Sequence, residues 1–287
     1  MENPIIEIAG SPDLPLPPAA IAALEAGKVL YFPDVSFQPA PAELQLFTPT
    51  IRAPKSRNIS LDATGRLHGA AVAPGQQAEL AAMLERFRTR AETLLATLCP
   101  RYQPALRRGP VSFRPDAVET RMQSWRADDR RLHVDAFPSR PCRGERILRV
   151  FSNVNPSGAA RLWRLGEPLE QAARRFLPQF SPYARWQAQL LLRLGITKSL
   201  RSEYDHLMLQ LHDAMKRSRD YQQNAPQISF GFPSGSTWVC FSDQTSHAAM
   251  SGQYLLELTA HLPPTAQYDA SASPLAILTR LTGRTLV

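Results

Sequence analysis

The run R-R-L-H-V-D-A-F-P-S-R, residues 130–140, and the run R-I-L-R-V-F-S-N-V, residues 146–154, decide the fold class of this sequence. The second run is apolar on both of its alternating faces, which is typical of a strand covered on both sides. Further strand-like runs occur at residues 5–8, 29–32, 111–113, 120–125, 132–137, 227–232, 237–241 and 253–262. These runs predict a core made mainly of β-strands.

Helical patterns flank and interrupt the strands. A helix is expected at 18–26, and Pro74 opens a longer one that Pro100 stops. A helical block follows at 167–177, 182–194 and 202–217, whereas residues 34–73 read as a loop with short strands. Helices packed outside an antiparallel barrel or sandwich predict an α+β fold. We expect one domain over 1–287, with a helical insertion at about 167–222 and a tail at about 263–287.

Positive charge is concentrated in one part of the chain. The 287 residues contain 33 Lys+Arg and 25 Asp+Glu, a net charge of +8, and only four of the basic residues are lysines. Residues 101–164 hold fourteen arginines and six acidic residues, so this stretch carries the whole surplus. The arginine count alone also fits genomic base composition, but a uniform bias does not predict clustering. Arginine binds carboxylates and phosphates bidentately, so we expect a cationic patch there.

The sequence shows no signal peptide, membrane span or paired-cysteine motif. The first ten residues carry two glutamates and lack a basic segment followed by an apolar one, so they do not read as a signal peptide. No run approaches the ~18 apolar residues of a membrane span. Cys99, Cys142 and Cys240 are far apart and include no C-x-x-C pair. We therefore expect a cytoplasmic protein with reduced thiols.

The candidate metal ligands are His133, Asp135 and His247. His133 and Asp135 are two residues apart in a strand-like run, and a strand turns alternate side chains to the same face. His247 follows the apolar run T-W-V-C-F and a polar loop, and it completes the two-histidine, one-carboxylate set of non-haem Fe(II) oxygenases. H-x-D also occurs by chance, and a histidine at a strand end often has a structural role. The residues alone leave both interpretations open.

Arg149 lies in the strand that is apolar on both faces. A buried arginine requires an anionic partner, because an isolated buried charge is very costly. That partner is either an internal Asp or Glu or the distal carboxylate of a bound 2-oxo acid, and the strand alone does not decide between them. Arg114, which precedes Pro115, is a weaker candidate for a second anion contact.

Two blocks of sequence resemble a known family. Residues 133–167, H-V-D-A-F through R-L-G-E, and residues 238–253, W-V-C-F-S-D-Q-T-S-H-A-A-M-S-G-Q, are similar to the Kdo 3-hydroxylases. These are bacterial Fe(II)/2-oxoglutarate dioxygenases acting on 3-deoxy-D-manno-oct-2-ulosonic acid (Kdo) of lipopolysaccharide. The resemblance covers roughly residues 20–262 and implies a double-stranded β-helix (jelly-roll, cupin-like) core. It also implies that iron is bound by His133, Asp135 and His247.

The resemblance further implies a 2-oxoglutarate pocket lined by Arg149, Arg114 and Trp163. One departure concerns this pocket. Many members of the wider superfamily carry an Arg or Lys about ten residues after the distal histidine, whereas here the next one after His247 is Arg280. The co-substrate anchor must therefore come from elsewhere, and Arg149 is the first choice.

The implied reaction hydroxylates C3 of Kdo on lipid A or the inner core, consuming 2-oxoglutarate and O₂ and releasing succinate and CO₂. Kdo carries a carboxylate and lipid A carries phosphates, so a basic patch can hold this glycolipid or contact the anionic cytoplasmic face of the inner membrane. The predicted substrate-binding residues are Arg126, Arg130, Arg131, Arg140 and Arg143. A solvated basic face is the alternative.

Two other functions remain as rivals. The sequence pI of 9.8 fits a nucleic-acid-binding protein. No helix-turn-helix, zinc-finger or RNP-like signature accompanies it, however, so nucleic acid is not the expected partner. The other rival is a metal-free jelly-roll module that binds an acidic sugar. Iron binding that responds to 2-oxoglutarate separates the oxygenase from both.

Overall fold

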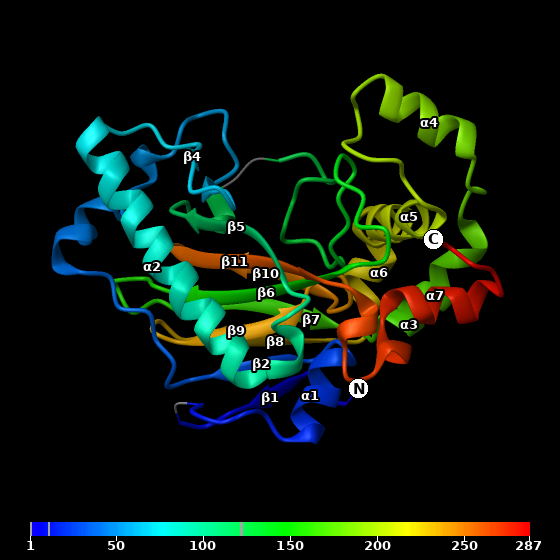
Figure 1. The fold of residues 1–287 in the computed structure, drawn as a ribbon, viewed down its shortest axis with the longest axis horizontal. Helices are drawn as coiled ribbons and strands as arrows, with labels where there is room; N and C mark the ends of the chain where they lie inside the picture. The colour runs from blue at the N-terminus through cyan, green and yellow to red at the C-terminus, as the bar shows by residue number, and fades with distance from the viewer. Residues whose placement is uncertain (1, 11, 121–122) are drawn as a thin grey trace.

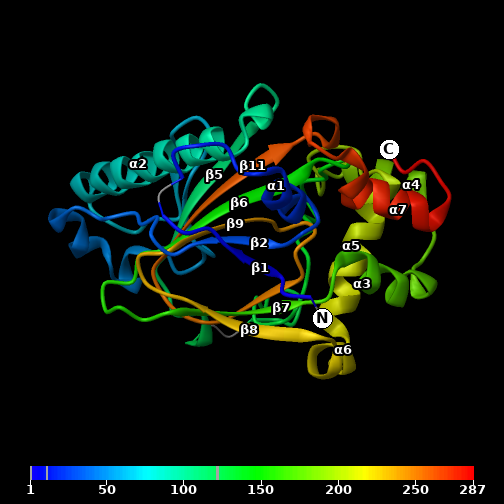
Figure 2. The ribbon, with the colours of Figure 1, turned by 90° about the horizontal axis from the view of Figure 1, so that it is seen from below.

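The computed structural model of the protein describes residues 2–10, 12–120 and 123–287. Two β-sheets face each other, and helices flank them (Figures 1 and 2). The larger sheet has the strand order β1-β2-β9-β6-β11-β5-β3-β4, and the smaller has the order β10-β7-β8. All pairs are antiparallel except β1 with β2. The predicted α+β fold with a jelly-roll core is confirmed.

The central strands of the large sheet are buried on both faces, apart from the exposed Arg107 and Arg108 at the start of one of them. They are β6 (Arg146–Asn153), β9 (Thr237–Phe241), β11 (Leu255–Leu262) and β5 (Arg107–Arg114). On β6, Leu148 and Val150 pack into the apolar layer beneath the N-terminal helices, whereas Phe151 packs into the layer between the sheets. Arg149 alternates with Leu148 and Val150, so it points toward the interior between the sheets.

The outer face of the large sheet is covered by α1 (Pro18–Glu25) and α2 (Pro74–Leu98). Figure 2 shows α2 lying along this face, opposite the small sheet. Proline at the first helical turn starts each helix, and α2 ends before Pro100 as its sequence predicts. Leu80, Leu84 and Phe87 form its buried stripe. The sheet edges are β1 (Ile5–Glu7), with β2 (Val29–Phe32) beside it, and the short β3 (Ile59–Leu61) and β4 (Leu67–His68).

The small sheet consists of β7 (Arg161–Gly166), β8 (Gln227–Phe232) and β10 (His247–Ser251). Trp163, Phe232 and Trp238 fill the layer between the two sheets. The sequence analysis did not predict β7 and β10. Each is short, and β7 carries arginines at Arg161 and Arg164, so neither shows the long apolar run expected of a strand.

The remaining helices gather at one end of the sheets (Figure 1). They are α3 (Leu169–Phe176), α4 (Arg185–Arg193), α5 (Glu203–Arg217), α6 (Arg219–Asn224) and α7 (Pro274–Thr282). The core that α3, α5, α6 and α7 share includes Leu211 of α5 and Leu278 of α7, together with Leu132 and Val134 beside the candidate metal ligands. These helices therefore support one end of the site. Among the described residues, no helix combines the length and apolarity that a bilayer crossing requires.

Two predicted strands are wrong. Residues 132–137 form no strand, and only His133 makes an isolated bridge, to His247. The amide of Asp135 bonds to Ser242 instead, and Pro138 then interrupts further pairing. Within the predicted strand 120–125, Arg121 and Met122 lie outside the described residues. The chain from 124 makes a turn in which the amides of Ala127 and Asp128 bond to the carbonyl of Ser124.

Candidate metal centre

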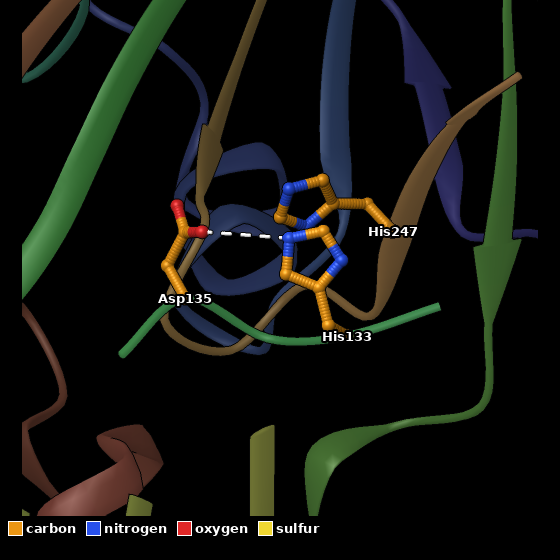
Figure 3. A group of neighbouring side chains, drawn as sticks. All are labelled: His133, Asp135 and His247. Atoms are coloured by element: carbon orange, nitrogen blue, oxygen red, sulfur yellow. Dashed lines mark ion pairs between the residues drawn. The ribbon is translucent and has the colours of Figure 1, made fainter. Parts of the chain in front are cut away.

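His133, Asp135 and His247 converge at the end of the space between the sheets (Figure 3). Each offers one ligand atom, and the three atoms lie within 4.8 Å of one another. His133 Nε2 is 3.7 Å from Asp135 Oδ1. The backbones of His133 and His247 exchange two hydrogen bonds, of 3.0 and 2.9 Å. The predicted convergence is therefore present, although a β-bridge rather than a strand produces it.

The backbone orients both imidazoles. His133 Nδ1 lies 2.7 Å from the carbonyl of Arg131, and His247 Nδ1 lies 2.8 Å from the carbonyl of Thr245. A carbonyl accepts only from an N–H, so each proton sits on Nδ1 and each Nε2 keeps its lone pair. Burial lowers the pKa of His133 well below its usual value, and burial also lowers that of His247. Two neutral imidazoles beside a carboxylate form the donor set of a non-haem Fe(II) site.

Close backbone packing places His247. Gly166 ends β7, and its amide bonds to the carbonyl of Ser246 at 2.9 Å. A Cβ at Gly166 would lie 2.5 Å from Ser246 Oγ, which is closer than real Cβ contacts. Glycine therefore lets the loop before β10 approach β7 closely enough to fix the position of His247.

A ladder of ion pairs supports Asp135. Arg149 Nη2 lies 2.8 Å from Asp135 Oδ2, and Arg149 Nη1 pairs with Glu257 of β11. Burial opposes the charge on Asp135, but the Arg149 guanidinium holds the pKa of this carboxyl well below its usual range. Asp135 therefore remains an anion that Arg149 fixes in one orientation. Of the two partners considered for Arg149, the structure contains the internal one.

The ladder continues through Arg114. Its guanidinium lies 2.8 Å from Glu257 Oε2 and 3.4 Å from Asp129 Oδ2. Asp129 in turn pairs with Arg57 at 2.9 Å. Burial would raise the pKa of Glu257, but Arg114 and Arg149 keep it below its ordinary value. Three alternating charges on the large sheet, Arg149, Glu257 and Arg114, thus brace Asp135, and Asp129 and Arg57 extend the series beyond the sheet.

Trp163 contacts the centre from the small sheet. Its ring stacks on the imidazole of His247, with centroids 5.1 Å apart and an interplanar angle of 24°. Phe151, Phe232 and Trp238 pack against its other sides. The indole Nε1 is buried and has no hydrogen-bond partner within residues 2–10, 12–120 and 123–287. Trp163 therefore restrains the His247 ring by stacking rather than by hydrogen bonding.

These groups line one cavity of about 990 Å³. Its basic lining residues are Arg57, Arg107, Arg108, Arg114, Arg126, Arg140, Arg149, Arg161 and Lys216. Its acidic lining residues are Asp62, Asp129, Asp135, Glu145, Asp213 and Glu257. The basic groups outnumber the acidic ones, which favours an anionic ligand.

The predicted substrate-binding arginines divide into two groups. Arg126 and Arg140 line the cavity. Arg126 pairs with Asp213 at 3.0 Å, whereas Arg140 makes no ion pair within the described part of the chain. Among the described residues, Arg130, Arg131 and Arg143 are not part of the lining. Arg130 pairs with Asp128, and Arg131 donates to the carbonyl of Lys216, so their role in substrate binding stays a prediction.

The sequence analysis missed Glu257, Asp129 and Arg161. Glu257 did have a signal, since it is the one acidic residue within the apolar strand L-L-E-L-T-A-H-L, and a buried acid requires a cation. Arg161 shares the inward face of β7 with Trp163 and is 3% exposed. Asp129 had no comparable signal, because it lies in a turn rich in charged residues.

Comparisons with known proteins agree on one family. The sequence model of the family described as 3-deoxy-D-manno-oct-2-ulosonic acid (Kdo) hydroxylase matches residues 16–285 of this chain. The apo structure of the Kdo hydroxylase KdoO, a non-heme Fe(II) alpha-ketoglutarate dependent dioxygenase, is 43% identical, with a TM-score of 0.95 over 99% of this chain and 97% of that one. The complex of KdoO with alpha-ketoglutarate and Fe(III) has the same identity and coverage and a TM-score of 0.94. Among curated proteins, none matches the sequence.

Proposed function

Because the chain belongs to the Kdo hydroxylase family, we propose that it is an Fe(II)- and 2-oxoglutarate-dependent dioxygenase that hydroxylates C3 of a Kdo sugar on lipid A or the inner core. The observation that supports this most strongly is the convergence of His133, Asp135 and His247 on one cavity wall. Two Nε2 lone pairs and a carboxylate suit Fe(II) and leave coordination positions for co-substrates. Neither a metal-free sugar-binding module nor a nucleic-acid-binding protein needs this arrangement.

Bound iron, with 2-oxoglutarate and O₂, supplies the oxidising power that replaces an unactivated C–H bond by C–OH, with succinate and CO₂ as products. C3 of glycosidically linked Kdo is a methylene without a readily removed proton, so acid–base groups alone do not serve. The protein's own residues orient the proposed ligands and exclude water. The carbonyls of Arg131 and Thr245 hold the imidazoles, Arg149 holds Asp135, and the aromatic layer around Trp163 excludes water.

The co-substrate pocket is proposed to lie between Asp135 and the arginines on the inner faces of the two sheets. Arg149 and Arg114 are the arginines proposed from the sequence, and both pair with Glu257. Arg161 lines the same cavity from β7, on the face of Trp163. Glutamine variants of each, compared by the KM for 2-oxoglutarate, identify the anchor. The variant that lacks the anchoring arginine should raise the KM for 2-oxoglutarate and change the KM for the Kdo substrate little.

The Kdo substrate is proposed to enter through the basic rim, with its carboxylate or phosphates facing Arg140 and Arg126. Arg140→Gln should raise the KM for the glycolipid about tenfold, since a charge-assisted hydrogen bond contributes about 1.5 kcal/mol or more. Arg90→Gln is the control, because Arg90 is an exposed arginine of α2 that does not line the cavity in the described structure. Equal KM values for the two variants would remove Arg140 from the substrate site.

The place of action is proposed to be the cytoplasmic surface of the inner membrane. Cys99, Cys142 and Cys240 are free thiols, which fits a reducing compartment. The activity itself is tested with protein purified anaerobically, loaded with Fe(II) and given 2-oxoglutarate, O₂ and Kdo-lipid A. Succinate and hydroxylated Kdo formed in equal amounts support the proposal, and glycolipid left unchanged would contradict it.

A further inference from the structure

Helix α4 and the turn after it expose an unusual amount of apolar surface. Trp186, Leu190, Leu194 and Ile196 are 64%, 47%, 62% and 51% exposed. Ala188 is the one buried residue of α4. Figure 1 shows α4 projecting beyond α5, away from both sheets. A contiguous exposed apolar surface of this kind marks an interaction site rather than ordinary surface.

The apolar residues share one side of the helix. Trp186, Leu190 and Leu194 are four residues apart, and side chains at this spacing lie one above another on a helix. Leu192, 38% exposed, extends the apolar surface around the helix. A tryptophan among leucines is typical of helices that lie in the interfacial layer of a membrane.

The charge around this apolar face is of one sign. Residues 181–202 contain no Asp or Glu and carry Arg185, Arg193, Lys198 and Arg201. Arg185, Arg193 and Lys198 are exposed, and none of them forms an ion pair among the described residues. Positive charge beside an apolar helix face complements anionic lipid headgroups.

The same segment is attached to the rim of the cavity. The amide of Lys198 bonds to the carbonyl of Ser139 at 2.8 Å, and the Arg201 guanidinium donates to the carbonyl of Pro138 at 2.8 Å. Pro138, Ser139 and Arg140 line the cavity that holds the candidate metal ligands. The apolar surface is therefore anchored where a membrane-embedded glycolipid must enter.

We propose that residues 185–198, with α4 lying in the interface, dock the protein on an anionic lipid bilayer and hold the cavity rim over the Kdo sugar of its substrate. The link to the substrate rests on the proposed function, whereas the docking itself does not. The apolar side chains enter the headgroup region, and Arg185, Arg193 and Lys198 contact lipid phosphates. The sugar then reaches the cavity without leaving its lipid.

The docking is tested by co-sedimentation with vesicles of phosphatidylethanolamine and phosphatidylglycerol, and with vesicles of phosphatidylcholine alone. We expect binding to the anionic vesicles that weakens with added salt. The triple variant Trp186→Ser/Leu190→Ser/Leu194→Ser should bind at least about tenfold more weakly. Arg185→Gln/Arg193→Gln/Lys198→Gln should bind about a hundredfold more weakly, since each of the three basic residues near an anionic surface contributes about fivefold.

A matched control replaces two exposed leucines elsewhere, Leu14→Ser/Leu44→Ser, which are 75% and 48% exposed. This control should bind vesicles like the parent protein. The proposal is overturned if the α4 triple variant binds as well as the control. It is also overturned if the parent protein does not bind vesicles and has a larger mass in solution than the triple variant. The apolar face then contacts a second copy of the chain.

Activity separates this inference from the proposed function. The α4 triple variant should keep its succinate formation with a water-soluble, deacylated Kdo substrate and lose about tenfold with Kdo-lipid A in vesicles. Equal losses on both substrates would overturn the positioning role. Loss of vesicle binding in the variants, with no hydroxylation of either substrate by the parent, supports docking and contradicts the proposed function.

Discussion

The candidate metal centre and helix α4 hold their charged and apolar groups in opposite ways. At the centre, Asp135 is paired with Arg149, which is paired in turn with Glu257, and the aromatic layer around Trp163 closes one side. On α4, Arg193 and Trp186 are exposed and have no ion-pair or ring partner among the described residues. The difference indicates a centre whose geometry is set inside the protein and a surface whose partner lies outside it.

Two arginines make the contrast concrete. Arg149 is 8% exposed, and although burial opposes its charge, Asp135 and Glu257 raise its pKa above the ordinary value. Its two Nη atoms are paired inside the fold. Arg193 lies on the surface, where its charge is available to a ligand. Substitutions at the centre should therefore change metal binding and stability, whereas those on α4 should change only association with lipid.

The largest effect is expected at the proposed metal ligands. Asp135→Ala or His133→Ala should reduce 2-oxoglutarate-dependent succinate formation by about a thousandfold or more, because the metal supplies the chemistry. Anaerobic Fe(II) titration checks this directly, since the variants should lose the single high-affinity site.

His212→Gln is the control for the ligand variants. The His212 ring meets the His133 ring edge-on, with centroids 5.5 Å apart, but His212 is not one of the three proposed ligands. It should keep one Fe(II) per chain. If Asp135→Ala still binds iron and His212→Gln does not, the proposed ligands are wrong.

A substitution at Glu257 should come next in size. Glu257→Gln keeps the shape but leaves Arg149 and Arg114 without their shared carboxylate. Breaking a buried ion pair costs about 3–5 kcal/mol, so the free energy of unfolding in urea should fall by about that much. Glu170→Gln, which removes two surface pairs, with Arg174 and Arg280, is a control that should cost less than about 2 kcal/mol.

Replacing Trp163 should have a smaller effect. Trp163→Leu removes the ring stacked on His247, and we expect about tenfold weaker Fe(II) binding, the lower end for groups that orient a metal ligand. Trp163→Phe should recover most of that loss, because a smaller ring can still stack. Identical Fe(II) affinities for the parent and both variants would exclude a positioning role.

Stability should also fall with decreasing pH. The pKa values of Asp129 and Glu257 in the fold lie below their ordinary values of ~3.9 and ~4.3, because the neighbouring arginines outweigh the effect of burial. The unfolded chain therefore takes up these protons at a higher pH than the folded chain does. The stability from both groups is present above about pH 5 and is lost as the pH falls further. Urea unfolding between ~pH 3 and ~pH 7 measures this slope, and Glu257→Gln should reduce it.

The smallest effect on stability is expected on α4. Trp186→Ser/Leu190→Ser/Leu194→Ser removes side chains that are already exposed, so the free energy of unfolding should change by less than about 0.5 kcal/mol per substitution. A loss comparable to that of Glu257→Gln would mean that these side chains pack within the protein, and the contrast between the two regions would fail.

The sequence predicted the parts of the molecule that repeat a simple pattern. Helix α2 and strands β6, β9 and β11 follow from apolar periodicity, and H-x-D with His247 pointed to the centre. Strands β7 and β10 were missed because they are short, lack a long apolar run, and gain their stability from each other and from the aromatic layer. Long-range pairing of this kind leaves no local signal in a single strand.

The ion-pair ladder shows a second limit. Burial on both faces of β6 implied an anionic partner for Arg149, but it did not indicate that there are two: Asp135 in the segment before β6, and Glu257, 108 positions away on β11. Sequence spacing does not reveal which buried acid meets which buried arginine, because sheet register decides it. In the same way, the apolar stripe of α4 reads like any core-facing helix until its exposure is known.

Anaerobic Fe(II) and 2-oxoglutarate titration, followed by exposure to ¹⁸O₂ with Kdo-lipid A, tests the assignment of function most directly. The parent protein should bind one Fe(II) per chain, form succinate, and place one ¹⁸O atom at C3 of Kdo, whereas Asp135→Ala should do none of these. A protein that leaves Kdo unlabelled while it binds Fe(II) and converts 2-oxoglutarate would contradict the assignment of its substrate. A protein without an Fe(II) site would contradict the metal centre itself.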